Sequence, residues 1–214
     1  MHIPLNVPFQ DKDFVKKIGA QWDNSRKIWY LWDYKKIQDV KQWLTKDYNI
    51  YITENLYLVE GQRICWGCKK STPVFSVGAD KFSFYSKDEK MWKFSPKFYL
   101  FNGISKHCNQ LNSLARSISQ NHFWVSKSKT IQTSYLMNHC YYCNRHQGEN
   151  YLYDEMDAVF APDNYINAST LTLHKIKIDV DIGLKGNLFS CFSSCGDTNM
   201  LIFNNAKVNS SLLF

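Results

Sequence analysis

Two short stretches, Cys65-Trp66-Gly67-Cys68 and Cys140-Tyr141-Tyr142-Cys143, decide how this chain of 214 residues is held together. Each is a C-x-x-C sequence, the spacing with which a short turn presents two thiolates to one tetrahedral ion. The chain starts without a basic region followed by an apolar stretch, so we expect no secretory signal and favour metal over a disulfide framework. We therefore predict a structural zinc site formed by Cys65, Cys68, Cys140 and Cys143.

The remaining thiols and imidazoles allow other interpretations. A redox role for one C-x-x-C pair lacks the βαβ setting of a thioredoxin-like site. His139 and His146 flank the second pair and are alternative ligands, although we expect them beside the metal or exposed rather than bound to it. Cys191 and Cys195 have no second pair as partner, so we interpret them as structural thiols rather than as an independent metal site.

The composition predicts a packed protein without a membrane span. The hydrophobic content is 44% and the aromatic content 16%, which favours a real core over disorder. No run of about 18 apolar residues occurs, so we expect no transmembrane helix. Without a secretory signal we expect a cytoplasmic location, where thiols stay reduced.

The net charge of +7 is concentrated in the middle of the chain. Residues 61–130 carry 12 basic and 3 acidic side chains. Part of this segment mixes cations with aromatic rings, a combination that binds single-stranded nucleic acid by phosphate pairing and base stacking. The more common arrangement of such residues is a solvated lysine face over a core built from those aromatics. The candidate contact residues are Lys87, Lys90, Lys93, Lys97, Trp92 and Phe94.

The first 48 residues predict a compact unit. A helix capped by Asp11 runs to Ile18 and ends at Gly19, a natural C-terminal stop. A strand is expected over residues 27–32. Asp33 then begins a second helix, in which apolar residues recur at helical spacing.

This segment resembles a small domain of unknown function found in bacterial and plasmid proteins, with the pattern L-N-V-P-[FY]-x-x-K-D-x-x-K-x-x-G-A-x-W-D-x-x-x-K-x-W-Y. The resemblance implies an accessory module attached to DNA-processing proteins of mobile elements, such as plasmid primases. We expect Trp22 and Trp29 to be core residues rather than stacking platforms, because so small a domain needs their buried area. The matching residues are Leu5, Asn6, Val7, Pro8, Phe9, Lys12, Asp13, Lys16, Gly19, Ala20, Trp22, Asp23, Lys27, Trp29 and Tyr30.

Residues 49–214 predict a β-rich domain with one amphipathic helix. The helix is expected over residues 104–120, with Cys108 as a buried thiol on its apolar face. Ile176, Ile178, Val180 and Ile182 alternate with charged residues, as in a half-buried strand. The expected strands are residues 50–60, 74–77, 82–85 and 171–182.

The two cysteine pairs are separated by 71 residues, far more than in a compact zinc ribbon. We interpret the basic segment, about residues 69–130, as an insert between two zinc knuckles. Gly67 and Asn144 are expected to give these turns the backbone freedom that they need.

At these residues the chain resembles a second, little-characterised bacterial group with an early C-W-x-C and a late [YW]-x-x-N-x-C-x-x-C-x-x-x-Q-G-[DE]-[FYW]-x-L. The resemblance implies a zinc-bound fold and no settled activity. Tyr151 lies one place later than the aromatic residue of the pattern. The matching residues are Cys65, Trp66, Cys68, Tyr135, Asn138, Cys140, Cys143, Gln147, Gly148, Glu149 and Leu152.

An enzyme is the less favoured interpretation. Histidines within a cysteine frame resemble zinc-stapled nucleases of the HNH type, which need an Asp-His pair to bind a catalytic metal. The upstream His107 and His122 are not preceded by a carboxylate, which leaves a nuclease as a remote alternative. No P-loop, G-x-S-x-G or deaminase signature occurs.

We therefore expect an α+β protein with a small N-terminal α/β module, residues 1–48, and a zinc-stapled β-rich domain, residues 49–214. The leading hypothesis is a non-catalytic binding protein of a bacterium or mobile element that contacts DNA, RNA or a nucleoprotein through its basic middle segment. The alternative is a protein-interaction factor, an inhibitor or adaptor of a host or phage machine. Neither a membrane partner nor a small-molecule substrate is indicated.

Overall fold

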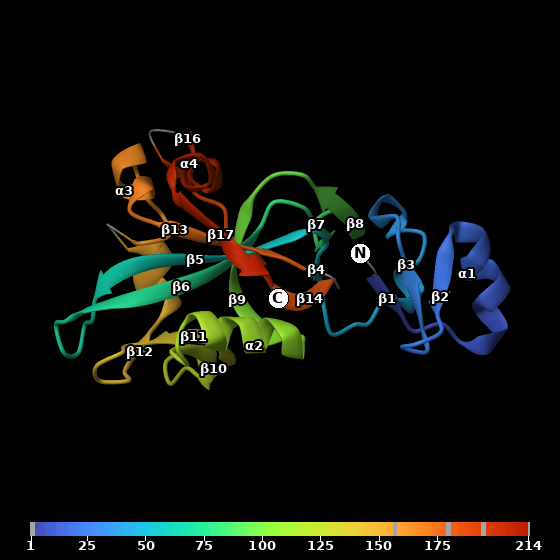
Figure 1. The fold of residues 1–214 in the computed structure, drawn as a ribbon, viewed down its shortest axis with the longest axis horizontal. Coiled ribbons are helices and arrows are strands. Elements are labelled where there is room, and N and C mark those ends of the chain that lie inside the picture. Colours follow the sequence, from blue (N-terminus) through green and yellow to red (C-terminus); the bar gives the residue numbers. More distant parts are fainter. Residues whose placement is uncertain (1–2, 156–157, 179–180, 194–195, 214) are drawn as a thin grey trace.

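The computed structural model describes residues 3–155, 158–178, 181–193 and 196–213, whose strands form four sheets. A three-stranded antiparallel sheet lies in the N-terminal module, at the right of Figure 1, and a nine-stranded sheet forms the centre of the molecule. A second three-stranded sheet and a two-stranded ribbon complete the set. The α+β class is confirmed.

The N-terminal module contains a sheet of order β1-β3-β2 and one α-helix. The helix ends at Gly19, whose φ of 109° is left-handed, so the predicted helix with its glycine stop is confirmed. Asp11 makes no side-chain cap and instead accepts a hydrogen bond from the indole N–H of Trp43 at 2.9 Å. The elements are β1 (Ile3–Leu5), η1 (Phe9–Asp11), α1 (Lys12–Ile18), β2 (Ala20–Asp23) and β3 (Ile28–Leu31).

The second helix predicted from Asp33 is replaced by two short 3₁₀ turns, η2 (Tyr34–Lys36) and η3 (Lys41–Trp43). The apolar residues that suggested it, Ile37, Val40 and Leu44, are nevertheless buried in the core of the module. The Trp43 carbonyl accepts a hydrogen bond from Asn6 at 2.7 Å, which ties the segment to the end of β1. Periodicity therefore predicted the buried face correctly and the backbone form wrongly.

The large sheet has the order β17-β13-β5-β6-β9-β14-β4-β7-β8. Its central strands are long, and the parallel pairing of β13 with β17 is an exception among antiparallel neighbours. The strands are β4 (Ile50–Ile52), β5 (Asn55–Ile64), β6 (Ser71–Ala79), β7 (Phe82–Ser86), β8 (Met91–Ser95), β9 (Tyr99–His107), β13 (Thr172–Lys177), β14 (Ile182–Leu188) and β17 (Lys207–Leu213).

Both faces of the large sheet are covered. Along β5, Leu56 and Leu58 face a core shared with the helix α2 (Asn109–Ile118), whereas Tyr57 and Val59 face a second core. The second core includes Ile202 of the helix α4 (Thr198–Asn205). In Figure 1 α2 lies below the sheet and α4 above it. The alternation of side chains along one strand therefore builds a three-layer domain.

Two elements of this domain differ from the sequence prediction. Ile104 lies in strand β9, and the amphipathic helix begins only at Asn109, because residues up to His107 pair with β14. Cys108 is the N-cap of that helix and is partly buried. The single strand predicted over 171–182 is two strands, β13 and β14, which pair with different neighbours; Val180 lies outside the described residues.

The expectation of one amphipathic helix was incomplete. The domain also contains α3 (Tyr165–Ser169), α4 and one π-helical turn, η4 (Asn150–Asp154). These helices are short, and α4 has no clear apolar stripe, so the sequence pattern did not predict them. Two small sheets complete the fold, formed by β10 (Phe123–Lys127), β11 (Ser134–His139) and β12 (His146–Gln147), and by β15 (Phe192–Ser193) and β16 (Gly196–Asp197).

The basic middle segment is part of the large sheet rather than a separate insert. It contributes β6, β7, β8 and β9, followed by α2 and β10. The hairpin of β7 and β8 also contacts the N-terminal module, since Trp92 belongs to the same core cluster as Trp43.

Among the described residues no helix is long and apolar enough to cross a membrane.

Candidate metal centre

The four predicted cysteines meet at one point, because each pair occupies the turn of a β-hairpin. Cys65 and Cys68 lie between β5 and β6, and Cys140 and Cys143 lie between β11 and β12. All four sulfur atoms lie within 4.8 Å of one another. The Sγ atoms of Cys65 and Cys143 are 3.6 Å apart, as are those of Cys68 and Cys140. Zinc–sulfur bonds of about 2.3 Å in a tetrahedron place sulfurs about 3.8 Å apart, so the cluster fits such an ion.

The two turns use the same hydrogen bonds. The N–H of Cys65 donates to the Lys70 carbonyl at 2.9 Å, and the N–H of Cys140 donates to the Arg145 carbonyl at 3.0 Å. The left-handed residue that closes each turn is Lys69, with φ 62°, and Asn144, with φ 55°. The expectation for Asn144 is confirmed. In the first turn this role belongs to Lys69 rather than to Gly67.

Gly67 is needed for a different reason, the close approach of Arg145. A Cβ atom at Gly67 would lie 2.4 Å from Cδ of Arg145, whose side chain crosses the first turn. The Arg145 guanidinium then lies 5.1 Å from the centre of the Trp66 ring. Glycine therefore allows a cation of the second turn to cover an aromatic ring of the first.

The pKa values of the thiols differ across the cluster. Burial disfavours ionisation of Cys65, but the N–H groups of Cys68 and Gly67 outweigh it and lower the pKa of Cys65 from 9.0 to about 6. The Arg145 N–H favours the Cys143 thiolate, yet burial and the other three thiols raise its pKa to about 11. Four thiolates gathered so closely need a positive ion between them.

Two buried amides connect the centre to the sheets. The Gln147 side chain donates to the Cys65 sulfur at 3.4 Å and to the Arg145 carbonyl at 3.0 Å. Asn138 of β11 bridges to β6, because its amide both accepts from the Phe75 N–H and donates to the Phe75 carbonyl, each at 2.7 Å. Asn138 thus joins the small sheet to the large one as an additional strand residue would.

The neighbouring histidines do not join the cluster of possible ligands. His139 is buried and its ring stacks on Trp124 with 3.5 Å between ring centroids. His146 meets His139 edge-on, and its carbonyl accepts the indole N–H of Trp66 at 2.7 Å. Cys191 is partly buried, and Cys195 lies outside the described residues, so that pair is not placed.

The outer side of the metal turns exposes two aromatic rings. Trp66 is 45% exposed and Tyr142 is 61% exposed. Each ring is paired with a cation from the opposite turn, Trp66 with Arg145 and Tyr142 with the Lys70 ammonium at 4.8 Å. Large exposed aromatics beside cations are typical of interaction surfaces.

Two long stretches of the chain, which include both metal turns, contain no acidic residue. No Asp or Glu occurs between Glu60 and Asp80, nor between Glu89 and Glu149. These stretches form both metal turns, α2 and the β10–β11 hairpin, and also strands β6, β8 and β9 of the large sheet. In Figure 1 α2, β10 and β12 lie below the large sheet, whereas β8 lies at its far end near the N-terminal module. The cations of the two stretches are Arg63, Lys69, Lys70, Lys90, Lys93, Lys97, Lys106, Arg116, Lys127, Lys129 and Arg145.

Comparisons with known proteins found a family match in the N-terminal module and a short similarity to one curated protein. Residues 2–45 match a family described as a domain of unknown function, DUF5710. The module is similar to this family. A stretch of 27 residues is 56% identical to the DNA primase TraC of Escherichia coli and covers 13% of this chain and 2% of the primase. No solved structure matches the chain. Both matches fit the resemblance to a mobile-element domain. The metal turns lie outside the DUF5710 match.

The predicted contact residues of the middle segment lie on the β7–β8 hairpin and just after it. Lys87, Lys90 and Lys97 are exposed, and Lys93 forms an ion pair with Glu89. Trp92 is 8% exposed, and its backbone N–H donates to the Gln38 side chain at 2.8 Å. Phe94 stacks on Tyr34 with 4.1 Å between ring centroids. The two aromatic rings therefore pack against the N-terminal module.

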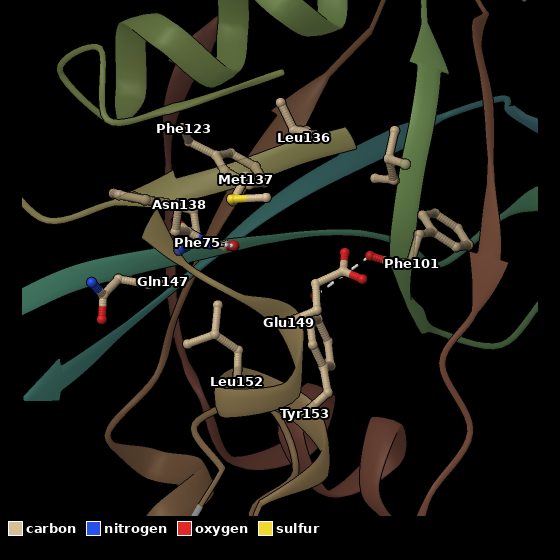
Figure 2. Close-up of a pocket in the computed structure, with 11 residues that line it drawn as sticks. Phe75, Phe101, Phe123, Leu136, Met137, Asn138, Gln147, Glu149, Leu152 and Tyr153 are labelled. Carbon is tan, nitrogen blue, oxygen red and sulfur yellow. Dashed lines mark hydrogen bonds between the residues drawn. The ribbon is translucent and has the colours of Figure 1, made fainter. Parts of the chain in front are cut away.

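The sequence did not predict a small buried cavity, which has a volume of about 10 Å³, the size of a single water. Figure 2 shows the Glu149 carboxylate pointing into it beside Tyr153 and Leu152. The carboxylate accepts a hydrogen bond from the Gly103 N–H at 2.6 Å. Burial raises the pKa of Glu149 from 4.5 to about 7. The hydrogen bond from Gly103 lowers this pKa, and the charge of Asp154 raises it further. The carboxyl group therefore changes its charge near neutral pH.

Proposed function

We propose that this chain is a zinc-stapled, non-catalytic nucleic-acid-binding protein that accompanies the DNA-processing machinery of a mobile element. The observation that carries the proposal is the pair of exposed rings on the metal turns, Trp66 and Tyr142, each paired with a cation and each in a stretch of the chain that contains no acidic residue. The similarity of the N-terminal module to DUF5710, and that of a 27-residue stretch of the chain to a DNA primase, support the same setting.

Zinc is the metal that suits this centre best. Four thiolates are soft ligands that favour zinc over magnesium or calcium, and a Cys₄ set fills all four tetrahedral positions. A filled site leaves no position for a reactive water, which supports a structural role. Zinc with four thiolates carries a formal charge of −2, which the nearby Lys69, Lys70 and Arg145 exceed, whereas Arg63 pairs with Glu155 at 3.0 Å.

The excess of positive charge suits a polyanion. Lysine and arginine side chains pair with phosphates, and exposed rings stack on bases, so each kind of residue on this surface has a partner in nucleic acid. Lys87, Lys90, Lys93 and Lys97 are proposed as further phosphate contacts from the β7–β8 side. Trp92 and Phe94 support that hairpin from within.

The experiment is fluorescence-anisotropy binding of the zinc-loaded protein to labelled single-stranded and duplex DNA and RNA across a salt series. We expect log affinity to fall linearly with log salt, and the K70A/R145A variant to reduce that slope by about 1.5, because two phosphate contacts are lost. The matched control is K35A/K41A, which removes the same charge from exposed positions in the N-terminal module.

Two results would count against the proposal. Absence of binding by the wild-type protein at low salt would remove nucleic acid as the ligand. An unchanged slope in K70A/R145A would move the contact surface away from the metal turns. A protein-interaction factor is then the alternative, and the exposed Tyr165 and Ile166 of α3 are the first surface to test.

A further inference from the structure

The N-terminal module leaves four large aromatic side chains exposed, Phe9, Phe14, Trp22 and Trp32, and two of them line one groove. Trp29 is buried as expected, but Trp22 is 45% exposed and Phe9 is 81% exposed. A domain of this size has little apolar area to bury, so exposing both rings sacrifices stability that the module would otherwise gain. The prediction that Trp22 belongs to the core is therefore wrong, and its exposure needs another explanation.

The exposed rings line a groove on the module. Its volume is about 270 Å³, and the described residues that line it are Phe9, Lys12, Lys16, Trp22 and Trp29. The Lys12 ammonium lies 4.0 Å from the centre of the Phe9 ring, and the Lys16 ammonium 5.8 Å from the Trp29 ring. All five residues belong to the motif through which the segment resembles its family.

The groove combines aromatic faces with two cations and, among the described residues that line it, no carboxylate. Asp13 pairs with Lys16 at 3.9 Å, but both side chains are largely exposed, so this contact holds Lys16 weakly. An apolar peptide would use the rings and leave both ammonium groups without an anionic partner. A nucleotide uses both, since its base stacks on a ring and its phosphates pair with lysines.

We propose that this groove binds one unstacked base of single-stranded nucleic acid, with Lys12 and Lys16 contacting the adjoining phosphates. This inference rests on the proposed function and adds a preference for single strands, because a duplex keeps its bases stacked away from Trp22 and Phe9. The metal turns then supply sequence-independent affinity, and the N-terminal groove supplies the selection of single strands over duplex.

The test uses the full, zinc-loaded chain with labelled 12-nucleotide oligo-dT, oligo-U and a 12-base-pair duplex. W22A is expected to weaken single-strand binding by about 5- to 100-fold and duplex binding by less than about 2-fold. W22F, which keeps a ring, should restore most of the lost affinity. The matched control is W32A, which removes an exposed tryptophan outside the groove.

The outcomes separate this inference from the proposed function. If the wild-type protein binds none of the probes, the proposed function fails and the groove falls with it. If K70A/R145A weakens binding while F9A, W22A and K12A/K16A leave single-strand affinity within about 2-fold, only the groove is refuted. Circular dichroism of each variant confirms that the module stays folded. Equal losses with oligo-dT and oligo-U mean that the groove does not read the sugar.

Discussion

Replacing Glu149 by glutamine is expected to stabilise the protein, and to do so more strongly as the pH rises. The folded protein raises the pKa of Glu149 from 4.5 to about 7, so the folded state holds this proton more tightly than the unfolded chain. The stability that this proton contributes is complete below about pH 4.5 and is lost as the pH rises towards 7. Above that value the folded protein carries a charge in its cavity.

The magnitude follows from the size of the shift. A shift of about 2.5 pKa units corresponds to about 3 kcal/mol at pH 8, of which about 1.4 kcal/mol is already lost at pH 5.5. The advantage of E149Q should therefore grow by about 2 kcal/mol between these two pH values. Glutamine keeps the side-chain oxygen that accepts from the Gly103 N–H, so the change removes the charge without removing that bond.

Urea unfolding of zinc-loaded wild type and E149Q, followed by tryptophan fluorescence at pH 5.5 and 8, measures the difference. Comparing the two proteins at each pH cancels the separate effect of pH on the metal thiolates. The exposed Asp88 supplies the control, since D88N removes a carboxylate from the β7–β8 turn and should change little. A stability difference of the same size at both pH values would refute the reasoning, because a buried charge is the source of the trend.

Three further changes test the fold and the metal centre. C140A should abolish tight zinc binding, measured by competition with a chromogenic chelator, and lower the unfolding free energy by about 4 kcal/mol, because the metal closes a loop of 71 residues. N138L should cost about 2–4 kcal/mol in urea unfolding, since it leaves the N–H and carbonyl of Phe75 unpaired; a neutral result would mean that water replaces the amide. W92A should cost about 3–5 kcal/mol and speed proteolysis between the module and β4.

The cluster of four cysteines was predictable from sequence because thiol spacing is a local property of a turn. Cys65, Cys68, Cys140 and Cys143 needed only two C-x-x-C sequences to be recognised. The reason for their meeting was not predictable, since the pairing of β11 with β12 and the bridge from Asn138 to β6 depend on contacts between distant segments. For the same reason the basic segment looked like an insert, although it supplies central strands.

Side-chain exposure was harder to predict than element type. Ile104 has helical spacing to its neighbours, yet hydrogen bonding to β14 keeps that part of the chain extended up to His107. The sequence placed Trp22 in a core and Trp92 among the candidate contact residues, but Trp22 lines an open groove and Trp92 is covered by the N-terminal module. Only tertiary contacts distinguish such cases, because hydrophobicity alone does not say which surface a ring will face.

The contacts across the metal turns resemble an isologous contact, although Trp66 is the second residue of its C-x-x-C sequence and Tyr142 the third. Arg145 of the second hairpin covers Trp66 of the first, Lys70 of the first covers Tyr142 of the second, and the sulfurs pair first with second in both directions. Symmetric dimers bury such self-complementary patches between two copies. Here one chain makes a similar contact with itself. A substitution in either hairpin therefore also changes the contacts of the other hairpin. The contact fixes the orientation of the two sheets relative to each other.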